Sequence, residues 1–164
     1  MMGVGKSTIG KMLAKKLKLN FADIDKIIEL REKNTISEIF NKRGEDYFRK
    51  IEKKNTINEL KKKNLVVALG GGAFMSNTIR NEAKNSSVSF WLDVNLAILL
   101  NRLKNVSKRP LLNQNNLEEA LKKIYSKRKK NYNEANFRVK CNSMNVEQIV
   151  NKIILLYENA RNKS

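Results

Sequence analysis

The sequence predicts an α/β domain built around a largely parallel β-sheet. Patterns typical of strands and of helices alternate along its 164 residues, as they do in domains whose helices cover a parallel sheet. The continuous apolar run 65–69 and the mostly apolar stretch 88–92 predict buried strands. A glycine-rich pattern at the start of the chain predicts a phosphate-binding loop in front of a helix. We therefore expect one domain with a ligand crevice at the carboxyl ends of its strands.

The phosphate-binding pattern covers residues 1–8, which read MMGVGKST. They match the second half of G-x-x-x-x-G-K-[ST], and the first glycine of that pattern would fall one residue before the chain begins. Gly3 and Gly5 allow the main chain to approach a phosphate closely, and their N–H groups can form an anion-binding nest. Lys6 is expected to reach the β- and γ-phosphates, and the Ser7 hydroxyl to ligate Mg²⁺. The alternative is a glycine-rich tail followed by an amphipathic helix.

The remaining elements follow from apolar spacing and from helix caps. Thr35, followed by Ile36, Ser37 and Glu38, has the spacing of a capping box, and Asn145 is a second candidate cap. Gly44 is expected to end the helix that Thr35 opens. The other expected helices cover about 9–17, 26–32, 45–62, 96–103, 117–130 and the segment after Asn145, and two short strands are expected near 21–23 and 137–139.

The charge balance is strongly basic. The chain has 34 basic and 16 acidic residues, which gives a net charge of +18, a value that by itself indicates nucleic acid. The lysines are spread along the whole chain, however, with short clusters only at 61–63 and 127–130. We therefore expect weak, salt-sensitive attraction to polyanions and no specific nucleic-acid partner.

The residue types that are scarce also limit the chemistry. The chain has no histidine, which excludes Ser–His–Asp and Cys–His catalysis and leaves acid–base work to carboxylates or lysines. Its single cysteine, Cys141, offers no disulfide framework and indicates a reducing cytoplasm. No apolar run approaches the length of a membrane span, and glycine and lysine interrupt the first residues where a secretory leader would be apolar. A cytoplasmic protein without a membrane partner is expected.

Two carboxylates follow the first expected strand. Asp23 and Asp25 lie two residues apart, so on an extended backbone both side chains would point the same way. At the carboxyl end of a parallel strand they would face the ligand crevice. One could then lie near Mg²⁺ while the other orients or deprotonates a hydroxyl. The alternative is a helix cap followed by a solvated acid.

Two further segments are candidates for ligand contacts. The run Gly70, Gly71 and Gly72 directly follows a buried strand and invites close approach by a ligand, or else forms a flexible turn. Arg109 precedes Pro110 in a long polar segment, where an arginine could swing onto phosphates or simply lie in a surface turn.

These stretches together resemble the shikimate kinase family, nearly from end to end. The resemblance rests on MGVGKSTIGKMLAKKL, FADID, TISEIFNKRGEDYFRKIE, VVALGGGA, SFWLDV, KRPLL and RKKNYNEAN, in this order. It implies one domain over 1–164 with the three-layer P-loop NTPase-like sandwich, a helical substrate-binding region at about 25–62 and a mobile lid at about 104–116. The family's first core strand, in the middle of the sheet, and the first glycine of its loop would precede Met1. A chain without that strand is expected to expose two strand edges and to be a poorer enzyme.

The resemblance also implies an activity and a set of residues. The activity is transfer of the γ-phosphate of ATP to the 3-hydroxyl of shikimate, with Mg²⁺, by a monomer. Lys6, Asp25 and Arg109 would be catalytic. The implied ATP contacts are Gly3, Val4, Gly5, Lys6, Ser7, Thr8, Arg102 and Arg109, and the implied metal contacts are Ser7 and Asp23. The implied substrate contacts are Asp25, Arg49, Gly70, Gly71, Gly72, Arg128, Phe40, Phe48 and Glu52.

Two other functions stay open on the sequence alone. The chain could be a P-loop kinase of another small hydroxylated metabolite such as gluconate. Arg49 and Arg128 indicate a compact substrate with a carboxylate, but they do not identify the ring of that substrate. It could also be a basic nucleic-acid-binding or regulatory remnant without turnover.

Overall fold

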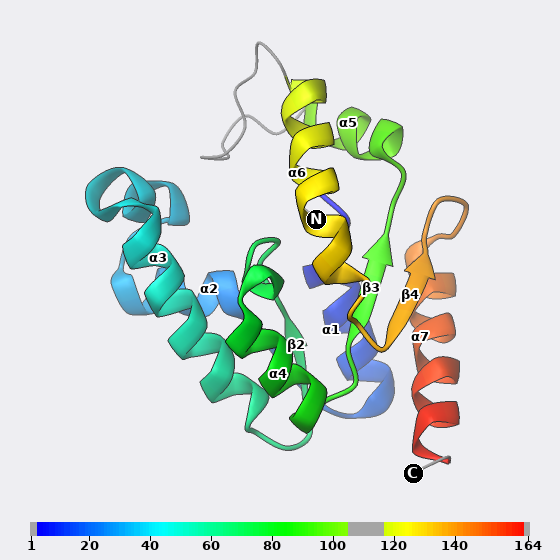
Figure 1. The fold of residues 1–164 in the computed structure, drawn as a ribbon. Helices are drawn as coiled ribbons and strands as arrows, with labels where there is room; N and C mark the ends of the chain where they lie inside the picture. The colour runs from blue at the N-terminus through cyan, green and yellow to red at the C-terminus, as the bar shows by residue number, and fades with distance from the viewer. Residues whose placement is uncertain (1–2, 105–116, 163–164) are drawn as a thin grey trace.

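Residues 3–104 and 117–162 are described by the computed structural model of the chain (Figure 1). Helices and strands alternate through these ranges. The elements are α1 (Lys6–Leu17), β1 (Asn20–Asp23), α2 (Ile24–Glu32), α3 (Ile36–Leu60), β2 (Leu65–Ala68), the 3₁₀ turn η1 (Ala73–Met75), α4 (Asn77–Ser86), β3 (Phe90–Asp93), α5 (Leu96–Lys104), α6 (Leu117–Tyr132), β4 (Phe137–Lys140) and α7 (Val146–Arg161).

The strands pair in parallel, as the sequence predicts. β1 pairs with β2 in a register that places Asp23 beside Ala68. β3 pairs with β4, and Asp93 lies beside Lys140. Figure 1 shows α4 in front of β2 and α1 behind β3, so helices cover both faces of the strands. The predicted α/β fold class with parallel strands is confirmed.

A groove of about 720 Å³ lies between β2 and β3, and both strands line it. Within the described residues these two strands do not pair with each other, and each keeps one edge without a strand partner. No strand precedes α1 in the described part of the chain. Within the described residues, β1 with β2 and β3 with β4 therefore form two separate parallel pairs.

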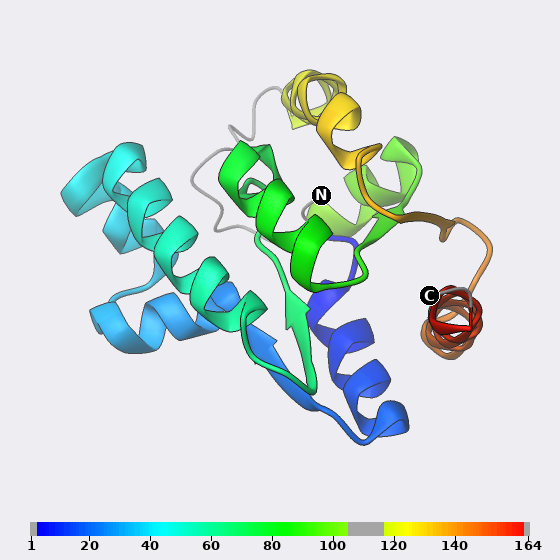
Figure 2. The same ribbon diagram turned by 60° about the horizontal axis from the view of Figure 1, so that its bottom comes forward.

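Two apolar clusters hold the described elements together. The larger one joins α1 to the second half of the chain through fully buried side chains such as Leu99, Leu121 and Val150. The smaller one lies between α2 and α3, which stand apart from α7 at the opposite side of the molecule in Figure 2. Its buried members are Ile24, Ile28, Ile39 and Phe48. The segment expected to bind the substrate thus packs around its own small core.

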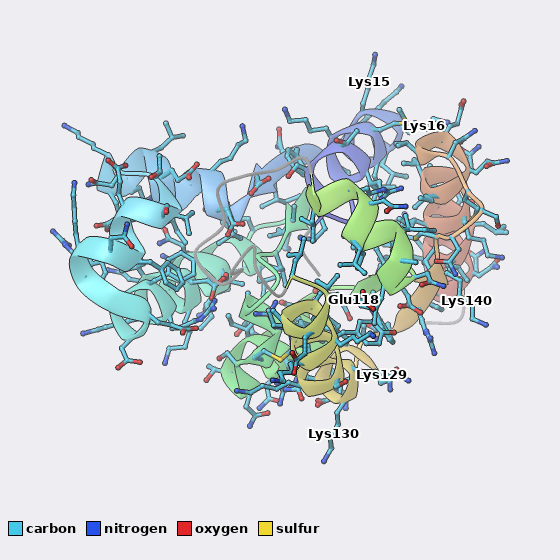
Figure 3. All side chains as sticks on the ribbon, turned by 90° about the horizontal axis from the view of Figure 1, so that it is seen from above. Lys15, Lys16, Glu118, Lys129, Lys130 and Lys140 are labelled. Atoms are coloured by element: carbon cyan, nitrogen blue, oxygen red, sulfur yellow. The ribbon has the colours of Figure 1, made fainter. Side chains whose placement is uncertain are left out.

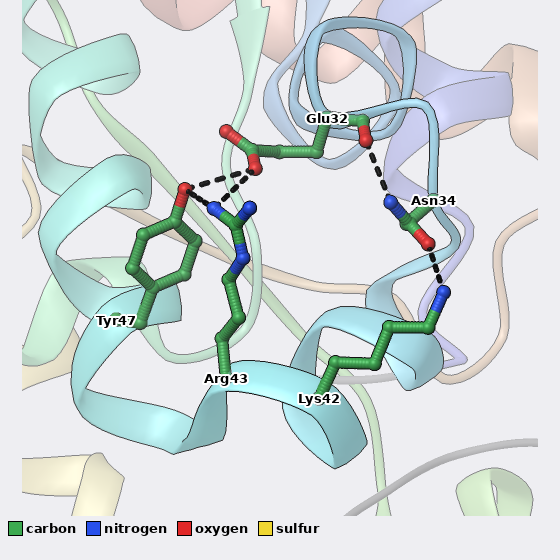
Figure 4. Close-up of polar contacts among 5 residues, drawn as sticks. All are labelled: Glu32, Asn34, Lys42, Arg43 and Tyr47. Carbon is green, nitrogen blue, oxygen red and sulfur yellow. Dashed lines mark hydrogen bonds and ion pairs between the residues drawn. The ribbon is translucent and has the colours of Figure 1, made fainter.

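The helix α3 is kinked at Gly44, where φ is +79° and the backbone is not helical. The predicted helix break is therefore correct. Polar contacts tie both sides of the kink to the end of α2 (Figure 4). After the kink, the Tyr47 hydroxyl donates to Glu32 Oε2 at 2.9 Å, and before it Arg43 contacts both groups. Lys42 Nζ donates to Asn34 Oδ1 at 2.6 Å. These contacts fix the angle at which α3 leaves α2.

Both predicted N-caps are confirmed as capping boxes. Thr35 Oγ1 accepts from the backbone N–H of Glu38, whose side chain accepts from the Thr35 N–H. Asn145 and Gln148 make the same reciprocal contacts at the start of α7. The helix α4 was not predicted. Its ten residues have only Ile79 and Ala83 buried, too few apolar positions to show a helical period.

Lysines extend outward from separate parts of the surface. Figure 3 shows Lys15 and Lys16 on α1, Lys129 and Lys130 on α6 and Lys140 on β4 pointing away from the core in different directions. This spread agrees with the interpretation that the charge is not gathered into one nucleic-acid-binding face. Among the described helices, none is both long and apolar enough to cross a membrane.

Candidate active site

The phosphate-binding loop has the conformation that its glycines allow. Gly3 and Gly5 have φ angles of +72° and +84°, in the left-handed region that residues with a β-carbon avoid. Gly5 is the N-cap of α1, which starts at Lys6. The loop thus turns its backbone directly into the N-terminus of α1, where N–H groups and the helix dipole favour an anion.

A polar cavity of about 330 Å³ lies beside this loop. Its walls come from the loop, from the ends of β1 and β2 and from α5. The residues that line it are Gly3, Gly5, Lys6, Ser7, Thr8, Asp23, Asp25, Ala68, Leu69, Arg102 and Leu103. The structure therefore gathers around one cavity most of the residues that the sequence assigned to ATP and Mg²⁺.

Val4 is buried and lines the apolar groove instead of the polar cavity, so only its backbone is available to a phosphate. Arg102 is exposed, and its Nη1 donates to the carbonyl oxygen of Gly3 at 3.4 Å. Arg109 lies outside the described residues, as do residues 105–116 of the segment expected at about 104–116 to form a lid.

Ser7 and Asp23 meet at the edge of the cavity. The Ser7 hydroxyl donates to Asp23 Oδ2 at 2.5 Å, and Asp23 Oδ1 accepts from the backbone N–H of Lys26 at 3.4 Å. Asp23 is therefore both a partner of the loop and the N-cap of α2. The described residues contain no cluster of three or more histidine, cysteine or carboxylate side chains that could hold a metal ion.

The expected extended backbone through Asp23 and Asp25 is wrong. β1 ends at Asp23, and α2 begins at Ile24, so Asp25 lies in the first turn of the helix. The cap formed by Asp23 starts the helix earlier than the sequence pattern indicated. Both carboxylates nevertheless line the same cavity, and Asp25 is half-buried and not fully solvated.

Next to Asp25, a charged cluster is centred on Arg49 of α3. Its Nη1 donates to Glu52 Oε2 at 2.6 Å, while Nε and Nη2 donate to Glu45 Oε1 at 3.1 and 2.9 Å. Burial alone would lower the pKa of Arg49, but Glu52 and Glu45 outweigh burial and raise it. The guanidinium is thus held in a fixed orientation and stays charged.

The glycine run after β2 approaches this cluster closely. A β-carbon on Gly70 would stand 2.7 Å from Glu52 Oε1 and 2.8 Å from Asp25 Oδ1. A β-carbon on Gly72 would stand 2.5 Å from Arg49 Nη1. Gly70 and Gly72 therefore lie against the ends of these charged side chains, which would have to shift to make room for a β-carbon.

Arg128 and Tyr132 complete the cluster from α6. Arg128 is only 8% exposed, and its charge influences both Glu52 and Tyr132. The Tyr132 hydroxyl donates to the carbonyl oxygen of Gly71 at 2.5 Å. Tyr132 was not identified from the sequence, although its position four residues after Arg128 places both side chains on one face of a helix.

The apolar wall of the cluster comes from Phe40 and Phe48. Their ring centroids lie 4.8 Å apart, and the Arg49 guanidinium lies 5.9 and 5.1 Å from the two centroids. Glu52 is 2% exposed. Burial raises the pKa of Glu52, Arg49 only partly offsets this, and Asp25 adds to the increase. All the residues assigned to the substrate therefore lie in one place, next to the polar cavity.

A phosphate-binding loop at a helix start, on parallel strands and beside two carboxylates, defines a P-loop phosphotransferase. The family model of shikimate kinase matches residues 2–158. The shikimate kinase of Sulfurihydrogenibium sp. is 42% identical over 93% of this chain and 91% of its own length.

Two solved structures agree with this result. The shikimate kinase of Acinetobacter baumannii in complex with shikimate superposes with a TM-score of 0.92 at 32% identity, over 97% of this chain and 89% of that one. The enzyme of Bacteroides thetaiotaomicron gives 0.88 at 29% identity, over 96% and 94%. The chain belongs to the shikimate kinase family. Its fold is the P-loop NTPase fold that the sequence predicted.

Proposed function

We propose that this chain transfers the γ-phosphate of ATP to the 3-hydroxyl of shikimate and releases ADP. The observation that supports it most is the position of Asp25. This carboxylate lines the polar cavity with the phosphate-binding loop, and its Oδ1 lies 2.8 Å from the place of a β-carbon on Gly70. Asp25 therefore lies where the phosphate subsite meets the carboxylate subsite. The acceptor hydroxyl must lie at the same junction in order to react.

The phosphate subsite would bind ATP through the loop backbone and Lys6. Ser7 and Asp23 offer hard oxygen donors that already touch each other, which fits Mg²⁺, an ion that binds through few protein oxygens and keeps several waters. They would hold the ion, and when bound it would neutralise charge on the transferred phosphoryl group. Arg102, at the cavity wall, would contact the nucleotide.

The acceptor subsite would bind the carboxylate of shikimate through Arg49 and Arg128. A planar guanidinium matches a carboxylate with two parallel hydrogen bonds. Glu45 and Glu52 orient Arg49 before the substrate arrives, which reduces the ordering cost of binding. The backbone of Gly71 and Gly72 and the rings of Phe40 and Phe48 would enclose the substrate ring.

In the transfer step, the hydroxyl oxygen of shikimate would attack the γ-phosphorus in line with the bond to ADP. That bond breaks as the new oxygen–phosphorus bond forms, and Asp25 would accept the hydroxyl proton. Lys6 would stabilise the negative charge on the transferred group. On the family resemblance, Arg109 of the lid would add a second positive charge there.

Phosphoryl transfer to different acceptors tests this proposal. ADP formation and ³¹P NMR of the products would be followed with shikimate, gluconate and nucleoside monophosphates as acceptors. We expect turnover with shikimate alone and a product that carries a phosphate monoester at the 3-position. Turnover only with gluconate or a nucleotide would contradict the proposal. A monomeric state and a cytoplasmic location are further parts of the proposal.

A further inference from the structure

We propose that Arg80 of α4 is a positioning residue that fastens the turn after β2 to the end of α6. This turn, residues 70–76, is called the glycine turn below; it contains Gly71 and Gly72, and α6 contains Arg128. Arg80 thereby fixes the backbone of the turn relative to the Arg128 guanidinium. The consequence for acceptor affinity rests on the proposed function, whereas the attachment itself does not.

Arg80 holds the glycine turn by two successive carbonyl groups. Its Nη1 donates to the carbonyl oxygens of Phe74 and Met75, each at 2.9 Å. Both residues belong to the 3₁₀ turn η1, and the last carbonyls of a helical turn have no partner within that turn. Nη2 also donates to Asn77 Oδ1 at 3.4 Å. One guanidinium therefore binds the end of the glycine turn and the start of α4.

The same guanidinium is attached to the segment that follows α6. Arg80 Nε donates to Glu134 Oε2 at 3.0 Å, and Glu134 lies two residues beyond the end of α6. The Arg80 side chain is only 13% exposed. Because a planar guanidinium offers donors in fixed directions, it joins the two segments in one geometry, unlike a solvated pair on the surface.

A second attachment joins the glycine turn to α6. The hydroxyl of Tyr132, the last residue of α6, donates to the carbonyl oxygen of Gly71 at 2.5 Å. The turn is thus held at Gly71 by Tyr132 and again a few residues later by Arg80. Attachments on both sides of Gly72 restrict its rotation as well as its displacement.

The placement of Gly72 matters because it lies against Arg49. A β-carbon on Gly72 would stand 2.5 Å from Arg49 Nη1, so a small rotation of the turn changes the space beside this guanidinium. Arg128 comes from α6 and is 8% exposed. Arg80 therefore connects groups of the acceptor end that come from different segments. Other residues line the polar cavity beside the phosphate-binding loop, so loss of Arg80 should weaken shikimate binding more than nucleotide binding.

Amide hydrogen exchange followed by NMR tests the attachment without catalysis. The Met75 N–H donates to the Gly72 carbonyl oxygen at 3.0 Å, so its exchange rate reports on the glycine turn. Arg80→Met keeps a long side chain but has no donor, and should speed this exchange at least about tenfold relative to the amide of Val150, which is buried in α7. Lys84→Ala, exposed on the same helix as Arg80, is the matched control and should change nothing. An unchanged rate in Arg80→Met would overturn the proposal.

Calorimetric titration with shikimate, and separately with ADP, tests the consequence for the acceptor end. Arg80→Met should bind shikimate about tenfold more weakly and ADP as the unchanged chain does. Ile79→Val removes one methyl group from a neighbouring side chain that is 1% exposed. It lowers stability but should keep the affinity for shikimate. An equal loss in both variants, or no loss in Arg80→Met, would contradict the positioning role.

Substitutions of Glu134 give a second test that leaves Arg80 in place. Glu134→Gln keeps an oxygen acceptor for Arg80 Nε and should bind shikimate as the unchanged chain does. Glu134→Ala removes the acceptor and should bind about threefold more weakly. Equal affinities of these two variants would contradict the proposal, and the comparison still decides if Arg80→Met does not fold.

The two kinds of readout separate this proposal from the proposed function. If the unchanged chain does not bind shikimate, the proposed function fails. Hydrogen exchange at Met75 then still decides whether Arg80 fastens the glycine turn.

Discussion

The proposed phosphate-binding end and the proposed carboxylate-binding end of the site are built in different ways. The first uses consecutive residues, with Gly5 turning the loop into α1. The second assembles Arg49 from α3, Gly72 from the turn after β2 and Arg128 from α6. A local motif therefore encodes one end, whereas the other depends on how three distant segments pack.

The two ends also differ in how they hold charge. The loop offers backbone N–H groups and the Lys6 side chain to a polar cavity. The carboxylate-binding end holds Glu52 and Arg128 at 2% and 8% exposure, and buried charges are costly unless each keeps its partners. Substitutions at the phosphate end should therefore act mainly on the rate, whereas those at the other end should act on affinity for shikimate and on stability.

Lys6→Ala should have the largest effect. Removal of the cation that stabilises the transferred phosphoryl group should lower kcat at least about 100-fold, while the folded state is retained. The readout is the steady-state rate of ADP formation with shikimate. Lys15→Ala is the matched control, because Lys15 is exposed on the same helix. Similar rates for the two variants would contradict the role of Lys6 in stabilising the transferred phosphoryl group.

Asp25→Asn tests the junction of the two ends. The amide cannot accept the hydroxyl proton, so kcat should fall about 100-fold or more, with KM for ATP nearly unchanged. Kinetics at varied ATP and shikimate separate the two effects. The control is Asp46→Asn, an exposed position on α3. A normal kcat in Asp25→Asn would refute its role as the base.

Tyr132→Phe tests the packing of the carboxylate-binding end. The variant loses the hydrogen bond to the Gly71 carbonyl, so KM for shikimate should rise about fivefold, the value of one net hydrogen bond, at unchanged kcat. Tyr125→Phe, on the same helix, removes a hydrogen bond to Asp93 instead and should leave KM unaltered. Equal KM values for both variants would contradict a contribution of Tyr132 to shikimate binding.

The smallest predicted effect is a pH dependence of stability at Glu52. Its pKa is raised in the folded protein, mainly by burial, so the folded state binds this proton more tightly than the unfolded state does. The stability that results is complete below the ordinary pKa of a glutamate and is lost as pH rises through the raised value. Glu52→Gln should therefore gain unfolding temperature relative to the unchanged chain as pH rises above about 4, the ordinary pKa of a glutamate. A difference that stays constant with pH would contradict this sign.

The sequence predicted those features that local patterns encode. The phosphate-binding loop, the helix caps at Thr35 and Asn145 and the break at Gly44 depend on residues within a few positions of each other. The resemblance also assigned Arg49, although no local pattern indicates that it lies over Gly72. The family is confirmed, while the individual residue roles stay predictions.

The features that the sequence analysis missed depend on contacts over long distances. The strand expected at 88–92 is β3, Phe90–Asp93, and it extends to Asp93 because the backbone of Asp93 pairs with Lys140 and Cys141 at the end of β4. Tyr132 contacts Gly71 across 61 positions of the chain. Neither contact leaves a local signal. Asp25 was misplaced because the cap formed by Asp23 starts α2 at Ile24, two residues earlier than the sequence analysis expected.

The central proposal is that Arg49 binds the carboxylate of the acceptor, while the residues of the phosphate-binding end catalyse the transfer. The most direct test is kcat/KM for shikimate and for its methyl ester, in the unchanged chain and in Arg49→Lys. The ester should be at least about tenfold poorer for the unchanged chain, because the paired charge is lost. The two acceptors should differ much less for Arg49→Lys, and Arg43→Lys should behave as the unchanged chain does. The same preference for shikimate over the ester in Arg49→Lys would contradict the account.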